Sequence, residues 1–251
     1  MRRIGDRFAE AAGSCADLSR LRELLAEAAL ELGFDHYALL DHSALAGEAE
    51  GLVRIDNYPT TWAEEMVERG FAADDPVHLA SRRACMGFAW NELSRFIGLD
   101  RRHRTILARS RRHGLGPGFT VPANLAGQPS ASCSFAVRAG AELPVQRLRS
   151  AELVGAHALR AARRLRPFAR PAPPRLSRRE VECLRLVARG KTDWEIARIL
   201  GVSPHTARQY VKRARAAYDS VSRAQLVVYG LRDSWISFED AIPPYGRMAP
   251  H

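Results

Sequence analysis

The residues of this chain that are best suited to binding chemistry lie in 193–218, where a turn of small residues joins two helical patterns of very different charge. Ser203 can cap the second pattern with its hydroxyl, and Pro204 suits the first helical position because its missing N–H would have no partner there. Gly201 accepts the left-handed backbone of the turn, and Ala197 allows the two helices to approach each other. The spacing predicts a helix-turn-helix.

The second of these helices is expected to carry one packing face and one basic face. Its apolar residues fall together at 100° per residue, namely Ala207, Tyr210, Val211, Ala214 and Tyr218. No acidic residue occurs in 203–215, so the other face would meet phosphates without repulsion, and Arg or Gln in its first half could hydrogen-bond base edges. The candidate DNA contacts are Ser203, His205, Thr206, Arg208, Gln209, Lys212, Arg213 and Arg215. A solvated basic helix is the alternative, which explains the charge but not the small residues around the turn.

A second set of chemically useful residues mixes aromatic and acidic side chains near the ends of expected strands and helices. Its members are Tyr58, Trp62, Phe71, Asp75, Phe88 and Trp90. One interpretation is a core of aromatic residues with a capping Asp. The other is a sheet with helices on one side that encloses an apolar ligand, which a tyrosine hydroxyl, an indole N–H and a carboxylate orient. The residues alone leave both interpretations open.

The elements that would position these residues suggest two domains. The chain has 251 residues, 46% of them hydrophobic and 26% charged, which fits one or two globular domains. Helical spacing occurs in 17–32, 60–69, 100–113 and 144–166, with Asp17 as a cap and Gly33 as a stop. Five strands are expected at His36–Leu40, Leu52–Ile55, Gly87–Trp90, 118–122 and 131–138.

Four prolines interrupt the pattern in 167–175, which predicts a stiff, extended linker. Four short helical patterns follow it, at 177–189, 193–200, 204–218 and 222–230. In the preceding helix, Leu148, Leu153, Leu159 and Leu165 form an apolar stripe that could serve a dimer. We expect the last ten residues to be disordered, whereas Trp235, Ile236 and Phe238 could dock on a neighbouring domain.

Charge and missing motifs narrow the function classes. The net charge of +10 comes almost entirely from Arg, which favours phosphate partners such as DNA. No apolar run approaches the roughly 20 residues that span a membrane, and acidic and basic residues break any signal-peptide core near the start, so we expect a cytoplasmic protein without a membrane partner. Enzyme motifs are missing, and four scattered cysteines are expected to be buried apolar groups rather than metal ligands. We therefore expect no catalytic residues, metal or cofactor.

The order of several residues resembles a known family. These are Tyr58-Pro59, Trp62, Asp75-Pro76, Trp90 and Gly118, followed by LSRREVECLRLVARGKTDWEIARILGVSPHTARQYV. Over about residues 15–230 the chain is similar to LuxR-type quorum-sensing transcription factors. The resemblance implies an α+β fold, with an α/β/α autoinducer-binding domain on a five-stranded antiparallel sheet at 1–166, the linker at 167–175, and a four-helix DNA-binding domain at 176–240 with a tail to 251. It also implies an N-acyl homoserine lactone as effector and a homodimer on a two-fold symmetric DNA site, with RNA polymerase as a further candidate partner.

The same resemblance implies roles for individual residues. Trp62 would donate to the lactone carbonyl, Asp75 would accept from the amide N–H, and Tyr58 would donate to the amide carbonyl. The other implied ligand residues are Ser134 as an auxiliary polar partner, Trp90 as an apolar wall, and Gly118, which would keep backbone close to the pocket. Met66 departs from the family, which has an aromatic residue there. It indicates either a different acyl chain or a regulator that answers another small molecule and has no lactone-making partner enzyme.

Two rival functions belong to other classes. An enzyme that modifies a small molecule would need a nucleophile motif, and the sequence lacks one. A response regulator would need an acidic cluster at a strand end, whereas Asp74 and Asp75 precede a proline and an expected helix. The doubly wound alternation of strands and helices is also missing.

Overall fold

The computed structural model describes residues 4–42, 53–125, 127–167 and 172–242. The chain divides into two compact units, Met1–Ala169 and Arg170–His251, each of which is described by itself. The expected linker begins in the first unit, and its residues 168–171 lie outside the described ranges. The same holds for most of the loop between the first two strands and for nearly all of the tail expected to be disordered.

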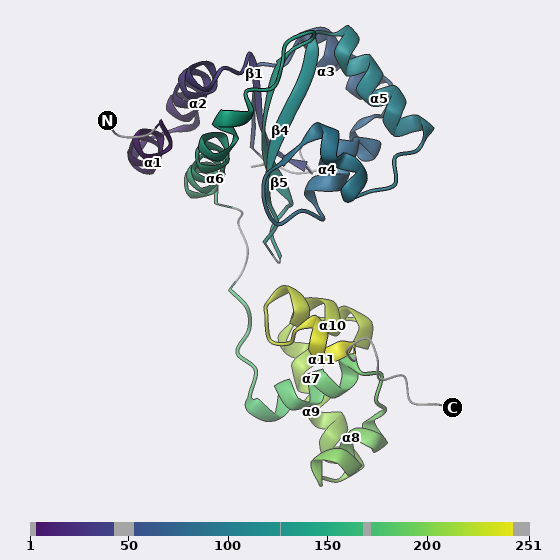
Figure 1. The fold of residues 1–251 in the computed structure, drawn as a ribbon. Helices are drawn as coiled ribbons and strands as arrows, with labels where there is room; N and C mark the ends of the chain where they lie inside the picture. Colours follow the sequence, from purple (N-terminus) through teal and green to yellow (C-terminus); the bar gives the residue numbers. More distant parts are fainter. Residues whose placement is uncertain (1–3, 43–52, 126, 168–171, 243–251) are drawn as a thin grey trace. The chain divides into compact units, whose positions relative to one another are not determined.

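The first unit is built on a five-stranded antiparallel sheet (Figure 1). Its strands are β1 (His36–Asp41), β2 (Arg54–Asp56), β3 (Phe88–Ala89), β4 (Leu115–Ala123) and β5 (Ala131–Arg138). They lie in the order β2-β1-β5-β4-β3, so the two longest strands are neighbours. The predicted fold class is confirmed. The predicted third strand is shorter than expected because Trp90 already begins a 3-10 helix, η3 (Trp90–Arg95).

Helices cover both faces of this sheet (Figure 1). On one face lie α1 (Ile4–Ser14), α2 (Leu18–Leu32) and α6 (Leu148–Leu165); on the other lie α3 (Thr60–Glu68), α4 (Pro76–Ser81) and α5 (Arg101–Arg112). Short 3-10 helices, η2 (Ala72–Asp74) and η4 (Val145–Arg147), precede α4 and α6. Adjacent residues of β5 point to opposite faces of the sheet. Cys133 points toward α6, since a Cβ atom added to Gly155 of α6 would lie 3.4 Å from Cβ of Cys133. Ser134 points toward α3, α4 and α5.

Local signals place several helix ends as the sequence predicts. The side chain of Asp17 accepts a hydrogen bond from the backbone N–H of Arg20 at 2.8 Å, and Gly33 ends α2 in the left-handed region with φ of 87°. Helix α1 was not expected from the sequence. It is held by tertiary packing, since Phe8 and Ala12 are buried against α2 and α6.

The apolar surface of α6 is used inside the first unit rather than left for a partner. Its buried residues are Ala151, Val154, Gly155, Ala158, Leu159, Ala161 and Ala162, which pack on the sheet and on α1 and α2. Of the leucines proposed as a dimer stripe, Leu159 is buried in this core, while Leu153 is 46% exposed. The four leucines therefore do not form one free stripe, and a dimer role for the exposed part of α6 stays a prediction.

The second unit is a small helical bundle. Its helices are α7 (Arg178–Ala188), α8 (Asp193–Leu200), α9 (Pro204–Ala217), α10 (Arg223–Arg232) and the short α11 (Phe238–Ala241). Four of them match the predicted patterns. Ile236 is buried and Trp235 partly buried in the core of this same unit, near Leu184, whereas Phe238 is 66% exposed. Ile236 and Trp235 therefore pack within their own unit, and docking on a neighbouring domain stays a prediction.

Candidate ligand and DNA sites

A small cavity lies on the face of the sheet that α3, α4 and α5 cover. Its volume is about 40 Å³, and its walls are formed by Ala38, Leu40, Tyr58, Trp62, Asp75, Val77, His78, Trp90, Ile106, Leu107, Ser110, Leu115 and Ser134. Five of the seven residues predicted to bind a ligand are among them: Tyr58, Trp62, Asp75, Trp90 and Ser134. A space of this size holds a few water molecules, so a larger molecule would have to move some of the wall side chains.

A row of residues across three strands lies on the cavity side of the sheet, and two of its members, Ala38 and Ser134, line the cavity. Ala38 pairs with Ser134, and Ser134 pairs with Thr120, so their side chains share one face of the sheet. The hydroxyls of Thr120 and Ser134 are 2.8 Å apart, and the indole N–H of Trp90 donates to Thr120 Oγ1 at 2.9 Å. The ring of Trp90 is thereby fixed in orientation. Thr120 was not among the predicted residues, although it lies two residues after Gly118 in the expected strand at 118–122, and alternate residues of a strand share one face.

Tyr58 and Trp62 bring polar groups into an otherwise apolar wall. Burial raises the pKa of the Tyr58 hydroxyl well above its usual value, with the carboxylate of Asp75 adding to the effect, while a hydrogen bond with Ser134 acts in the opposite direction. Trp62 is 5% exposed and packs against Phe71. Both side chains therefore present neutral donors.

Asp75 has both a structural and a potential binding role. Its Oδ1 accepts a hydrogen bond from the backbone N–H of Val77 at 2.8 Å, which caps α4, and Pro76 occupies the first helical position. Its Oδ2 is directed to the side of His78, 3.7 Å from Nδ1 of that ring. One oxygen is thus committed to the helix, while the other is available to a donor at the cavity.

Met66 and Gly118 lie next to the cavity but do not line it. Met66 is buried in a cluster with Trp62 and Ile106, one layer behind the wall. A Cβ atom on Gly118 would lie 2.5 Å from Cε2 of Trp90, so this glycine makes room for the indole ring on the sheet. From the sequence, Gly118 was expected to let the backbone lie close to the ligand. In the structure, the group that lies close to the backbone of Gly118 is the indole ring of Trp90.

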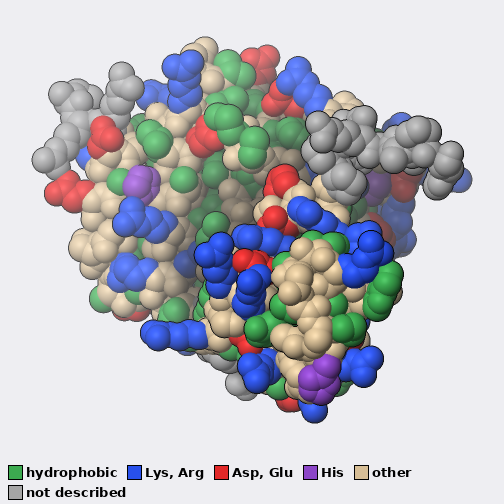
Figure 2. Space-filling view, turned by 90° about the horizontal axis from the view of Figure 1, so that it is seen from below, with side chains coloured by type: hydrophobic (Ala, Val, Ile, Leu, Met, Phe, Trp, Pro, Cys, Tyr) green, Lys and Arg blue, Asp and Glu red, His purple; other side chains and the backbone are tan. Residues whose placement is uncertain are grey.

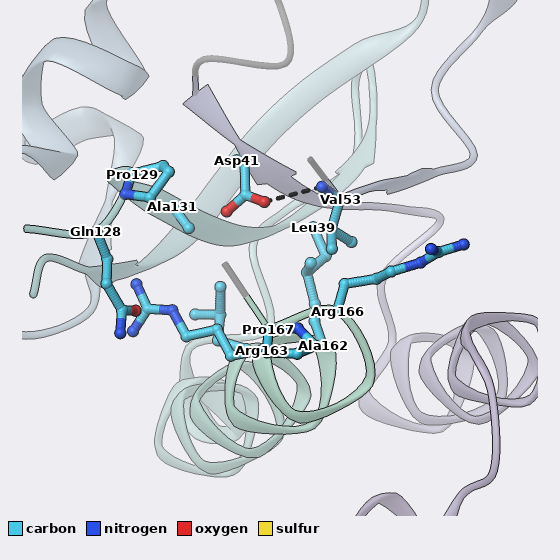
Figure 3. A pocket seen from close by; sticks show the side chains of 11 residues that line it. Leu39, Asp41, Val53, Gln128, Pro129, Ala131, Ala162, Arg163, Arg166 and Pro167 are labelled. Atoms are coloured by element: carbon cyan, nitrogen blue, oxygen red, sulfur yellow. Dashed lines mark hydrogen bonds between the residues drawn. The ribbon is translucent and has the colours of Figure 1, made fainter. Parts of the chain in front are cut away.

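A second cavity, of about 140 Å³, lies between the sheet and α6 (Figure 3). Asp41 faces it while its Oδ2 accepts from the backbone N–H of Val53 at 2.8 Å, and Arg163 faces it while donating to the carbonyl of Ala123 at 3.0 Å. Burial lowers the pKa of Arg163, which Asp41 partly offsets. None of the residues predicted to bind ligand lines this space, so the smaller cavity is the candidate ligand site.

The second unit forms the predicted helix-turn-helix. Gly201 ends α8 with φ of 66°, and Ser203 caps α9 by accepting from the backbone N–H of Thr206 at 3.0 Å. The packing face of α9 is buried at Ala207, Val211 and Ala214. On the opposite side, His205, Arg208, Lys212 and Arg213 are exposed, and Gln209 and Thr206 are half-buried. Of the predicted DNA contacts, Ser203 differs from the others because its hydroxyl accepts the capping hydrogen bond from Thr206.

Two arginines of α9 have partners within the protein. Arg208 Nε lies 3.6 Å from Asp193 Oδ2 at the start of α8, and its side chain is 73% exposed, so this ion pair contributes little and is easily exchanged. Arg215 donates to the backbone carbonyls of Ser220 and Val221, at 3.3 and 2.6 Å. Arg215 thereby ties the end of α9 to the following loop.

The second unit is basic in its own right, since 176–230 holds eleven Lys or Arg against five Asp or Glu. Figure 2 shows a face of the molecule on which basic side chains, in blue, predominate over acidic ones, in red. Two of these acidic residues, Glu180 and Glu195, take part in capping boxes, and hydrogen bonds from Thr192 and Lys191 lower the pKa of Glu195 to about 2. A basic surface around an exposed helix suits the phosphates of DNA.

Both parts of the chain match known protein families. Residues 17–165 match the autoinducer binding domain, and residues 174–229 match the luxR family of bacterial regulatory proteins. The chain belongs to the LuxR-type regulators with an autoinducer-binding domain. It is a regulator of transcription that binds DNA and a small-molecule autoinducer, and it is not an enzyme.

Individual relatives cover different shares of their own length. The chain is 32% identical over 187 residues to the putative HTH-type transcriptional regulator y4qH of Sinorhizobium fredii, a match over 73% of this chain and 56% of that protein. It is 26% identical over 224 residues to the transcriptional activator AhyR of Aeromonas hydrophila, covering 87% and 86% of the two chains. Its fold resembles the crystal structure of Escherichia coli SdiA with a TM-score of 0.62 and 23% identity, over 92% of this chain and 97% of that one.

Within the described ranges, no helix combines the length and the apolar character needed to cross a membrane. Among the described residues, no three His, Cys, Asp or Glu side chains group as a metal ion would require. Cys15, Cys133 and Cys183 are buried as expected, whereas Cys85 is exposed, which corrects the expectation that all four are buried.

Proposed function

We propose that this regulator binds an N-acyl homoserine lactone in the cavity between the sheet and α3 to α5. The observation that carries the proposal is the convergence of a hydroxyl, an indole N–H and a carboxylate, from Tyr58, Trp62 and Asp75, on one small space. An acylated lactone has two carbonyl oxygens for the two donors and one amide N–H for the carboxylate. Trp62 would donate to the lactone carbonyl, Tyr58 to the amide carbonyl, and Asp75 would accept from the amide N–H.

The remaining predicted ligand residues would act through these three. Ser134 supports the Tyr58 hydroxyl from the sheet, and Trp90 supplies an apolar wall. Gly118 acts indirectly by leaving room for Trp90, and Met66 acts indirectly by packing behind Trp62. In this account Met66 changes the shape of the acyl end of the site without touching the ligand.

Ligand binding would also stabilise the first unit. A cavity of about 40 Å³ is too small for an acyl chain, so the wall helices would move outward and then pack against the ligand. A ligand that binds only the folded state stabilises it by RT ln(1 + [L]/Kd), which is about 2.7 kcal/mol at a hundredfold excess over Kd. Such stabilisation would couple ligand concentration to the amount of active regulator.

On the DNA side, we infer a homodimer that places two copies of α9 on a two-fold symmetric site in the cytoplasm. Arg208, in the first half of α9, is suited to a guanine edge once it leaves Asp193. Lys212 and Arg213 are exposed and suited to phosphates. Arg215 supports the helix from behind, and RNA polymerase is a further expected partner of DNA-bound regulator.

The second candidate ligand is an acylglycerol. The Escherichia coli SdiA structure in complex with octanoyl-rac-glycerol resembles this chain with a TM-score of 0.61, 23% identity and coverage of 91% and 93%. The family has an aromatic residue at the position of Met66, and this difference is also consistent with a ligand other than a lactone. The hydroxyls of an acylglycerol could donate to Asp75 in place of the amide N–H.

Selection of DNA by the full-length protein from a random duplex library tests the proposal. The protein is incubated with lactones of short, medium and long acyl chains, with octanoylglycerol, or without ligand. We expect one class of lactone to enrich a two-fold symmetric sequence. Enrichment by octanoylglycerol alone would favour the second candidate, and equal enrichment without any ligand would contradict ligand control.

A further inference from the structure

A pair of buried histidines adjoins the candidate ligand site. His78, on α4, lines the cavity and is 9% exposed, and His42, just after β1, is 6% exposed. Their rings stack with centroids 4.6 Å apart and planes 28° from parallel. His42 is anchored through Nε2, which lies 2.9 Å from the hydroxyl of Ser132. The stack therefore holds the ring of His78 in place against the cavity.

His78 is poorly satisfied as a polar group. Its Nδ1 is buried and makes no hydrogen bond within the described chain, and the nearest carboxylate oxygen, on Asp75, is 3.7 Å away. Most buried polar groups in folded proteins have a partner, and a buried group without one lowers stability. One nitrogen of an imidazole at the cavity wall thus lacks a partner within the described chain, which points to a partner from the ligand.

The position of this ring relative to Asp75 limits which part of a ligand would reach it. Asp75 and His78 are three residues apart across the first turn of α4, which places their side chains about 5–6 Å apart at Cβ on one face. If Asp75 holds the amide N–H, as the proposed function states, His78 lies beside the atoms close to that amide. A neutral imidazole has one donor and one acceptor, so it would pair with a hydroxyl or a carbonyl oxygen there.

We propose that His78, held by His42, selects ligands whose acyl chain carries an oxygen close to the amide. This inference rests on the proposed function and adds the class of acyl chain to it. A plain chain would cover the imidazole with methylene groups and leave it without a partner, whereas a 3-hydroxy or 3-oxo chain would satisfy it. Sites that hydrogen-bond a ligand group discriminate strongly against analogues that lack it.

The test compares N-octanoyl, N-(3-hydroxyoctanoyl) and N-(3-oxooctanoyl) homoserine lactone on the full-length protein, by thermal stabilisation and by titration of ligand-dependent DNA binding. The wild-type protein is expected to prefer at least one oxygenated lactone by about 10-fold to 100-fold. His78→Leu should bring that preference to near unity, and His78→Gln, which keeps a donor and an acceptor, should retain part of it. Val77→Ala is the matched control, since Val77 lines the same cavity with an apolar side chain and should change all three affinities alike.

The outcomes separate this inference from the proposed function. If lactones bind but the wild-type protein does not prefer an oxygenated chain, or if His78→Leu keeps the preference, the inference is wrong and the proposed function stands. If none of the three lactones binds at any concentration, both are wrong. If His78→Leu fails to fold, the comparison of His78→Gln with wild type decides, because a purely structural role would leave the preference unchanged in that variant.

Discussion

Asp75 Oδ1 accepts a hydrogen bond from the backbone N–H of Val77 at 2.8 Å, while Oδ2 of the same carboxylate lies 3.7 Å from Nδ1 of His78, and both residues line the cavity. The residue thus begins a helix and presents a charge to the candidate site at once. Replacing it by Ala would remove both functions and confuse a loss of ligand with a loss of fold. A variant that keeps the cap is needed to separate them.

Asp75→Asn is that variant. Asn caps helices about as well as Asp, so the free energy of unfolding should change by less than about 1 kcal/mol. Its amide would place a donor opposite the ligand N–H, so ligand affinity should fall by about 1–3 kcal/mol. Asp74→Asn is the control, because Asp74 pairs with Arg102 outside the cavity. Unchanged lactone titration of Asp75→Asn would show that the carboxylate does not contact the ligand.

Gly118→Ala should disturb the site through Trp90. The new Cβ would lie 2.5 Å from the indole ring, so the ring would shift and its hydrogen bond to Thr120 would be lost. We expect about 1–3 kcal/mol of destabilisation, as for other overpacked cores, together with a weaker ligand response. In Gly98→Ala, the control, the new Cβ would meet nothing within 4 Å. Chemical unfolding of the two variants checks this, and equal stabilities would contradict the packing account of Gly118.

Arg208→Ala and Arg213→Ala should separate base reading from phosphate contact. Loss of an Arg–guanine contact costs about 1–3 kcal/mol at the specific site and much less on random DNA. Loss of a phosphate contact weakens binding to all sequences alike and reduces the slope of log affinity against log salt by about one unit. Fluorescence anisotropy at several salt concentrations measures both. If Arg208→Ala lowers the affinity for the specific site and for random DNA equally, Arg208 contacts only the phosphate backbone and the base-reading assignment is wrong.

His42 should make the first unit less stable in mild acid. Desolvation, followed by the proximity of His78 and Arg82, lowers the pKa of His42 to about 3, against about 6.5 in an unfolded chain. Between these values the unfolded chain binds a proton that the folded chain does not, so stability falls as the pH decreases from about 6.5, by at most about 1.4 kcal/mol per pH unit. His42→Phe should flatten the curve of unfolding free energy from pH 8 to 5. His205→Gln, in the other unit, should leave it unchanged; a similar flattening there would refute the assignment.

Local chemistry was sufficient to predict many boundaries from the sequence. Asp17 and Gly33 bound α2, and Gly201 and Ser203 bound the turn of the helix-turn-helix, because caps depend on residues close in the chain. Contacts between distant segments were not predictable in this way. Helix α1 depends on burial of Phe8 against α2 and α6.

The candidate site shows the same division. Five of the seven residues taken from the family resemblance line one cavity. They could be predicted because their order along the chain, relative to the expected strands and helices, matches the family. The position of Met66 behind Trp62 depends on how α3 and α5 pack, and the stack of His42 on His78 joins residues 36 positions apart. These relationships have no local signal, so only the folded structure supplies them.

Mass spectrometry of small molecules extracted from the purified protein tests most directly whether an acylated lactone occupies the cavity beside Asp75. Wild-type protein, Asp75→Asn and Asp74→Asn are produced in cells supplied with a mixture of acyl homoserine lactones and acylglycerols. We predict that wild type and Asp74→Asn retain one lactone in about equal amounts and that Asp75→Asn retains much less. Recovery of acylglycerol without lactone from the wild-type protein, or of the same amount of lactone from folded Asp75→Asn, would contradict lactone binding beside Asp75.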